Sequence, residues 1–283
     1  MGLLMFEPRD DPGPSFSAVL RMNHPSASAP GGAQNPVLVQ DARERGGLAV
    51  DLPFRHGTTV AALRYVDGVV MAGDRWATEG NVIAHRTMEK VFPADRHSAV
   101  AIAGAAGPAV EMVKLFQTQL EHYEKVEGVL LSLEGKANQL GQMVREHLPM
   151  AMQGLVVVPL YAGYDLTRHE GRIFTYDVTG GHFEEADHAA TGSGGRDART
   201  TIKLGWKRDL GRDEAIELAV RALYEAADED AATGGPDVVR GVFPMVVTVS
   251  EEGYEEVTQE EVATRFATLV EQRGLGRGQG GGV

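Results

Sequence analysis

Residues 58–74 have the sequence TTVAALRYVDGVVMAGD. The runs 58–66 and 68–74 are rich in apolar and β-branched residues, and the Asp67-Gly68 pair between them is a favoured hairpin turn. We therefore predict two paired β-strands here, with Thr58 opening the first.

The rest of the chain predicts an alternation of strand groups and helix pairs. Apolar residues recur with a period of about 3.6 in the predicted helices, and β-rich runs mark the strands. Further strands are expected at 98–103, 155–164, 172–178, 242–250 and 254–257, with a short one after 179–181, and helices at 109–127, 133–148, 197–206, 213–229 and from 258 on. Because strict strand–helix–strand alternation is missing, a parallel Rossmann-like sheet is disfavoured. Two mostly antiparallel sheets with paired helices outside them fit the order.

The two ends differ from the middle in composition. Residues 1–57 hold seven of the 13 prolines, and six of the last ten residues, 274–283, are glycine. Such segments bury too little apolar surface to offset the entropy of ordering. We expect a flexible leader at 1–57, a folded domain at 58–273 and a disordered glycine-rich tail at 274–283.

Composition excludes several classes of function. The net charge is −13, from 40 acidic and 27 basic residues, which disfavours nucleic-acid binding. Cysteine is absent, so disulfides and thiolate chemistry are excluded. No apolar run reaches the roughly 20 residues of a membrane span, and residues 1–6 are too short for a signal-peptide core. A soluble, cytoplasmic protein is expected.

Two familiar kinds of site find little support. The histidines include no HExxH pattern, so no metal site is expected. The run Thr191-Gly192-Ser193-Gly194-Gly195 resembles a phosphate-binding loop but lacks the Gly-Lys-Ser/Thr ending of a Walker motif. A nucleotide-binding module would rest on this run alone.

At the boundary between the leader and the first strand, Thr58 could act as a nucleophile. If the Gly57–Thr58 bond is cut, Thr58 becomes the N-terminal residue and has both a hydroxyl and a free α-amino group. An α-amino group has a pKa of roughly 7.7–8.0 and can act as a base near neutral pH. It could take the hydroxyl proton directly or through a water molecule, whereas an amide nitrogen could not. The same dipeptide also fits a β-branched residue that only opens a strand.

A resemblance favours the chemical interpretation. The stretch from Thr58 to Phe92 (TTVAALRYVDGVVMAGDRWATEGNVIAHRTMEKVF) resembles the start of a mature 20S proteasome β subunit. The similarity continues through IAGAAGPAVEM, LEHYEKVEG, TGSGG and DEDAATGGPDVVRG, in the family's order and spacing, over about residues 57–270. The segments LEHYEKVEG and AATGGPDVVRG are most similar to the actinobacterial type of this subunit.

The resemblance implies a threonine protease. Thr58 matches the N-terminal nucleophile, and Gly57 matches the residue before the self-cleaved bond. Lys90 in MEKVF matches the catalytic lysine, and Asp74 in MAGD matches its acidic partner. An ammonium group beside Thr58 would favour the ionised hydroxyl and the neutral amine.

The other implied site residues complete the active centre. Ser193 in TGSGG matches the serine beside the threonine amine, and Asp230 and Thr233 in DAAT match two groups that steady it. Gly104 matches a backbone donor to the tetrahedral oxyanion. Backbone positions that pair with an extended substrate match Thr78, Gly104 and Ala106, and the apolar specificity pocket matches Ala77, Met88, Ile102 and Ala106. The apolar lining implies cleavage after apolar residues.

The implied fold is α+β, the four-layer α/β/β/α sandwich of the N-terminal-nucleophile hydrolases, with two mostly antiparallel sheets. The implied particle is a homo-heptameric β ring stacked with proteasome α-subunit rings around a closed chamber. A ring-shaped ATPase would act through the α rings and feed it unfolded proteins, often marked by a ubiquitin-like tag. No cofactor, metal, nucleic acid or membrane is implied.

Two departures and three alternatives accompany the resemblance. Trp76 stands where many family members have Arg, and Thr233 stands where many have Ser.

The alternatives are an HslV-type peptidase, an N-terminal-nucleophile amidase and a structural ring subunit without activity. The long leader and the DAATGGPD run disfavour the HslV type, and the combination of Thr58, Asp74 and Lys90 disfavours an inactive subunit.

Overall fold

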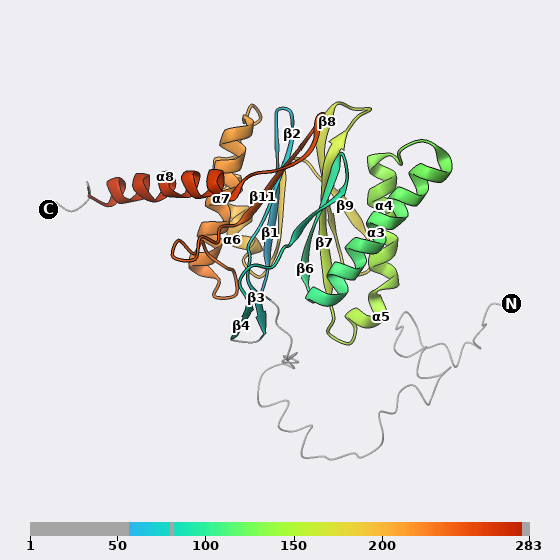
Figure 1. Ribbon diagram of the computed structural model, residues 1–283, viewed down its shortest axis with the longest axis horizontal. Helices are drawn as coiled ribbons and strands as arrows, with labels where there is room; N and C mark the ends of the chain where they lie inside the picture. The colour runs from blue at the N-terminus through green and yellow to red at the C-terminus, as the bar shows by residue number, and fades with distance from the viewer. Residues whose placement is uncertain (1–56, 80–81, 279–283) are drawn as a thin grey trace, which may run out of the picture. The chain divides into compact units, whose positions relative to one another are not determined.

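The hairpin predicted at the start of the domain is present. Strands β1 (Thr59–Tyr65) and β2 (Gly68–Gly73) pair antiparallel across the Asp67-Gly68 turn. The computed structural model describes residues 57–79 and 82–278 (Figure 1). The expected leader therefore lies outside the described residues, apart from Gly57.

Two five-stranded antiparallel sheets form the centre of the domain. The first has the order β10-β1-β2-β11-β12 and the second the order β5-β6-β7-β8-β9. A separate hairpin consists of β3 (Ala77–Glu79) and β4 (Val82–His85). The remaining strands are β5 (Val91–Asp95), β6 (Ser98–Gly104), β7 (Val157–Asp165), β8 (Glu170–Tyr176), β9 (His182–Glu185), β10 (His188–Gly192), β11 (Met245–Ser250) and β12 (Gly253–Glu256).

Helices cover the outer face of each sheet (Figure 1). The second sheet carries α3 (Ala106–Glu127), α4 (Leu133–Glu146) and the short α5 (Leu148–Ala151). The first sheet carries α6 (Gly195–Gly205) and α7 (Arg212–Glu229), with α8 (Gln259–Gly278) beyond them.

Three apolar cores separate the four layers. The alternation of side chains along β1 shows why: Val60 and Ala62 enter the core between the sheets, while Ala61 and Leu63 enter the core under α6 and α7. The third core lies between the second sheet and α3/α4, where the predicted helix face including Phe116 is buried. Because β1 is covered on both faces, most of its residues are apolar. The α+β, four-layer α/β/β/α expectation is confirmed.

The sequence analysis missed four short strands: β3, β4, β5 and β10. Strand β4 is mostly exposed and β10 runs into the Gly192-Ser193-Gly194-Gly195 segment, so neither has a clear apolar alternation. At the other end, α8 continues to Gly278, into the expected tail, because extending an existing helix costs less than starting one. Residues 279–283 of the tail lie outside the described residues.

Candidate active site

Thr58 lies at the entrance to β1, between β2 and β10. Its side chain is only 6% exposed, and its Oγ1 donates a hydrogen bond to the Gly57 carbonyl oxygen at 2.8 Å. The Ser193 N–H donates to the Thr58 carbonyl oxygen at 2.8 Å. Gly192 has φ +98°, and a Cβ there would lie 1.8 Å from that carbonyl oxygen, so glycine permits this close approach.

A buried ion pair lies beside the backbone of this segment. The Lys90 Nζ lies 2.6 Å from Asp74 Oδ1, and the two side chains are 1% and 0% exposed. The same oxygen accepts the backbone N–H of Thr59 at 2.8 Å. Asp74 therefore links the Lys90 ammonium to the peptide that follows Thr58.

The second carboxylate oxygen of Asp74 is also fully used. Asp74 Oδ2 accepts the backbone N–H of Trp76 at 3.0 Å and that of Gly234 at 2.9 Å. A Cβ on Gly234 would lie 2.5 Å from the Trp76 ring, so the indole packs directly on the Gly234 backbone. The Arg86 guanidinium lies 5.3 Å from the centre of the same ring. Trp76, the departure noted in the sequence, thus holds both donors in place.

The environment of Lys90 favours release of its proton. Burial lowers the pKa of Lys90 below its ordinary value, because the charged ammonium loses its hydration. The charges of Asp74 and Asp230 oppose this shift without cancelling it. Lys90 is therefore a paired cation that gives up its proton more readily than an exposed lysine.

Ser193 lies next to the nitrogen of Thr58. The Thr58 N–H donates to Ser193 Oγ at 3.3 Å, and Ser193 Oγ donates to the Thr58 carbonyl oxygen at 3.4 Å. The nitrogen that would become a free amine on cleavage therefore already has a hydroxyl partner.

Asp230 and Thr233 reach the site through Thr59, which the sequence analysis did not single out. Thr233 Oγ1 donates to Asp230 Oδ2 at 2.6 Å, so it accepts the bond from Thr59 Oγ1, also at 2.6 Å. Thr59 Oγ1 in turn accepts the Gly194 N–H at 2.9 Å. The only sequence signal for this role is a threonine at the start of a largely apolar strand; in the structure its hydroxyl is fully buried and so needs a partner.

The expected oxyanion and substrate-binding positions flank Gly57 and the end of β6. Thr78 Oγ1 accepts the Gly57 N–H at 2.7 Å. Gly104 ends β6 with φ +113°, and a Cβ there would lie 2.1 Å from the Val156 carbonyl oxygen. Ala106 follows as the first residue of α3. The donor role of Gly104 stays a prediction, as do the substrate contacts of Thr78 and Ala106.

The four expected pocket residues come from different elements. Ala77 is on β3 and Ala106 on α3, and both are half-buried, as is Met88, whose N–H donates to the Arg75 carbonyl oxygen. Ile102 is 3% exposed and belongs to the core under α3, while its N–H donates to the Lys90 carbonyl oxygen at 2.9 Å. The pocket itself stays a prediction.

The glycine-rich loop at 191–195 has little capacity left for a phosphate. Its Ser193 N–H is bonded to the Thr58 carbonyl oxygen and its Gly194 N–H to Thr59 Oγ1. Phosphate loops need such N–H groups free to face the ligand.

Within 57–79 and 82–278, no group of three or more His, Asp or Glu side chains is placed to hold a metal ion. In the same residues, no helix is long and apolar enough to cross a membrane.

Comparison with known proteins identifies similar chains. The family model described as proteasome subunit matches residues 54–240. The chain is 58% identical over 280 residues to the proteasome subunit beta of Acidimicrobium ferrooxidans, covering 98% of this chain and 97% of that one. It is 58% identical over 240 residues to that of Streptomyces griseus (85% of each chain) and 52% identical over 218 residues to that of Jonesia denitrificans (77% and 72%).

Proposed function

The chain belongs to the proteasome subunit family, as a β subunit of the core assembly with other subunits, and its relatives imply a peptidase. From this premise we propose that it is a threonine-type endopeptidase, which exposes its nucleophile by cutting its own Gly57–Thr58 bond. The observation that carries the proposal is the position of Thr58. Its hydroxyl lies at the scissile carbonyl, and the Asp74–Lys90 pair is bonded to the next peptide group.

Self-cleavage needs no group from outside the chain except water. Thr58 Oγ1 attacks the Gly57 carbonyl carbon, and its proton passes to the Thr58 nitrogen as the C–N bond breaks. The product is an ester between Gly57 and the Thr58 hydroxyl. Water then hydrolyses this ester, which leaves a carboxylate on Gly57 and both a free hydroxyl and a free amine on Thr58. The bond from Oγ1 to the Gly57 carbonyl oxygen, 2.8 Å long, supports this path because it holds the nucleophile beside its target.

Substrate hydrolysis repeats this chemistry with the free amine as base. The amine takes the Thr58 hydroxyl proton, Oγ1 attacks the substrate carbonyl, and the leaving amine receives a proton. An acyl-enzyme ester remains until water releases it. In this proposal Lys90 favours the neutral amine and the ionised hydroxyl, Ser193 positions the amine, and the Gly104 N–H stabilises the oxyanion. Asp230 and Thr233 steady the segment through Thr59.

The proposal extends to the particle and its substrates. We expect a homo-heptameric β ring stacked with α-subunit rings, with active sites facing a closed chamber in the cytoplasm. A ring-shaped ATPase would deliver unfolded, ubiquitin-like-tagged proteins. These statements rest on the family to which the chain belongs.

Substitution of Thr58 tests the proposal. In the assembled particle, Thr58→Ala should abolish both leader removal and hydrolysis of a fluorogenic peptide, whereas Thr58→Ser, which keeps a hydroxyl, should retain both at a reduced rate. Thr264→Ala is a matched control, because Thr264 is an exposed threonine on α8. Normal peptide turnover by Thr58→Ala would contradict the mechanism. An inactive wild-type particle that keeps its leader would identify a structural subunit instead.

A further inference from the structure

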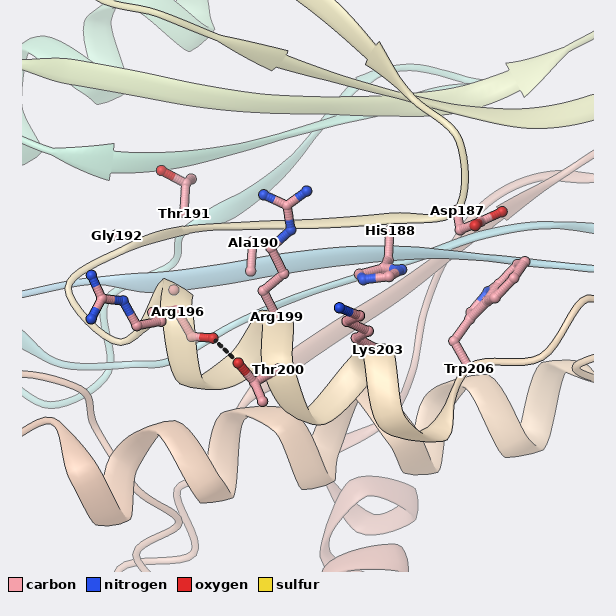
Figure 2. A pocket seen from close by; sticks show the side chains of 11 residues that line it. Asp187, His188, Ala190, Thr191, Gly192, Arg196, Arg199, Thr200, Lys203 and Trp206 are labelled. Atoms are coloured by element: carbon pink, nitrogen blue, oxygen red, sulfur yellow. Dashed lines mark hydrogen bonds between the residues drawn. The ribbon is translucent and has the colours of Figure 1, made fainter.

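A groove opens between β10 and α6, next to the proposed site but lined by none of the side chains that the proposed reaction uses. Its volume is about 850 Å³, within the usual range for ligand sites. Figure 2 shows β10 along one wall and α6 along the other, with Arg196 at one end and Trp206 at the opposite end.

The α6 wall of this groove is positively charged. Arg196, Arg199 and Lys203 lie three and four residues apart, which places them on one face of the helix (Figure 2). All three are exposed, and among the described residues no carboxylate lies within 4 Å of Arg196 or Lys203 to form an ion pair. Arg199 has only a long contact of 3.6 Å with Glu185. Three clustered cations on a chain of net charge −13 form a local site for anions.

The β10 wall is the edge of a sheet. β10 pairs with β1 and ends the strand order, so among the described strands it has no partner on its other side. The groove lining includes Ala190, Thr191 and Gly192 of this strand. A free strand edge next to a groove can accept an extended peptide as an added strand.

The spacing of the cations matches such a peptide. Arg199 and Lys203 are four residues apart, about 6 Å along the helix axis. Alternate residues of an extended strand lie roughly 6.6 Å apart and point to the same side. Carboxylates at every second position would therefore face these two cations together.

We propose that the β10/α6 groove is a docking site for an extended acidic segment of a partner polypeptide. The segment adds to β10 as a strand, with acidic side chains at alternate positions paired to Arg199 and Lys203, while Arg196 adds positive charge at the end of the groove. This proposal goes beyond the peptidase activity and does not depend on it.

His188 supports an anionic occupant. Its ring points into the groove in Figure 2, and its Nδ1 is buried without a hydrogen-bond partner among the described residues. Burial and the nearby Arg199 and Lys203 lower the pKa of His188, while Asp187 and Glu185 oppose the shift. A carboxylate placed beside the ring would favour its protonated form, so docking should tighten as the pH falls from 8 to 6.

Fluorescence anisotropy on the full chain tests the proposal, with a labelled peptide in which glutamate and threonine alternate. A peptide of the same composition with its glutamates grouped at one end is the reference for spacing. We expect the alternating peptide to bind more tightly, and Arg199→Glu or Lys203→Glu to weaken it about tenfold each, the effect of losing one charge-assisted contact. Arg208→Glu is the matched control, because Arg208 is an exposed base outside the groove lining.

The outcomes separate docking from general attraction. Tighter binding of the alternating peptide that only the groove substitutions weaken supports the proposal. Equal weakening by Arg208→Glu would mean that net charge alone attracts the peptide, and would overturn it. Failure of the alternating peptide to bind, or equal binding of both peptides, would overturn it as well. Because the readout is binding, an inactive peptidase leaves the test intact.

Discussion

Replacing Asp74 with Asn tests the buried pair at the centre of the proposed site. Asp74 accepts four hydrogen bonds on two oxygens, from Lys90, Thr59, Trp76 and Gly234. Asparagine keeps the shape but only one acceptor oxygen. If that oxygen faces the Trp76 and Gly234 N–H groups, the new amide NH₂ faces the Lys90 ammonium and the Thr59 N–H.

The structure sets the size of the effect. Lys90 is 1% exposed, so Asp74→Asn leaves a buried cation without its counter-charge. Loss of one partner from such a pair costs about 3–5 kcal/mol of unfolding free energy. We expect the variant to fold with reduced stability, because a domain usually has roughly 5–15 kcal/mol. Peptidase activity should fall by about 10²–10³-fold, the usual cost of losing one electrostatic stabiliser, because a Lys90 without its counter-charge no longer favours the ionised Thr58 hydroxyl.

Two further variants separate stability from catalysis. The double variant Asp74→Asn/Lys90→Met removes the unpaired charge, so it should regain stability in thermal denaturation without regaining activity. Asp95→Asn breaks the Asp95–Lys136 pair, which is also largely buried but lies outside the proposed site. It should lower stability while kcat stays within about twofold. Turnover by Asp74→Asn within about twofold of the wild type would refute the role given to the pair.

Three other predictions follow from the site. Trp76→Ala removes the ring that packs on Gly234, so kcat should fall by roughly tenfold with KM little changed. Trp76→Phe keeps an aromatic ring and should retain most of the wild-type kcat. A rise in KM at constant kcat would instead make Trp76 a substrate contact. Because the pKa of Lys90 is lowered, the fraction of charged Lys90 falls at a lower pH than for an ordinary lysine, so the alkaline decline of kcat/KM should be centred below pH 10.5; a decline centred at or above that value would contradict the pKa shift. In a panel of fluorogenic peptides, cleavage after apolar residues should be fastest, and equal or faster cleavage after acidic residues would exclude the apolar pocket.

Local patterns predicted much of the fold. The β1–β2 hairpin follows from its alternation and its Asp67-Gly68 turn, and the buried face of α3 follows from its 3.6-residue period. The short strands β3 and β10 have no such pattern, because pairing with distant segments defines them. A helix or strand was therefore predictable where its own segment has a periodic apolar pattern or a characteristic turn.

The site was predictable only in part. Asp74 and Lys90 were identified by resemblance, since nothing in their spacing of 16 residues shows that the side chains meet. Thr59 was missed because its partners, Gly194 and Thr233, lie 135 and 174 residues away in the sequence. Those contacts exist only once the sheet has brought β1, the start of α6 and the loop after α7 together.

The intact mass of the β subunit in an assembled, active particle tests the central claim most directly. The account predicts a chain that begins at Thr58 and runs for 226 residues to Val283, with Gly57 as the C-terminus of the released leader. An active particle whose β subunits still begin at Met1 would contradict it, because the Thr58 nitrogen would then be an amide and could not serve as the base.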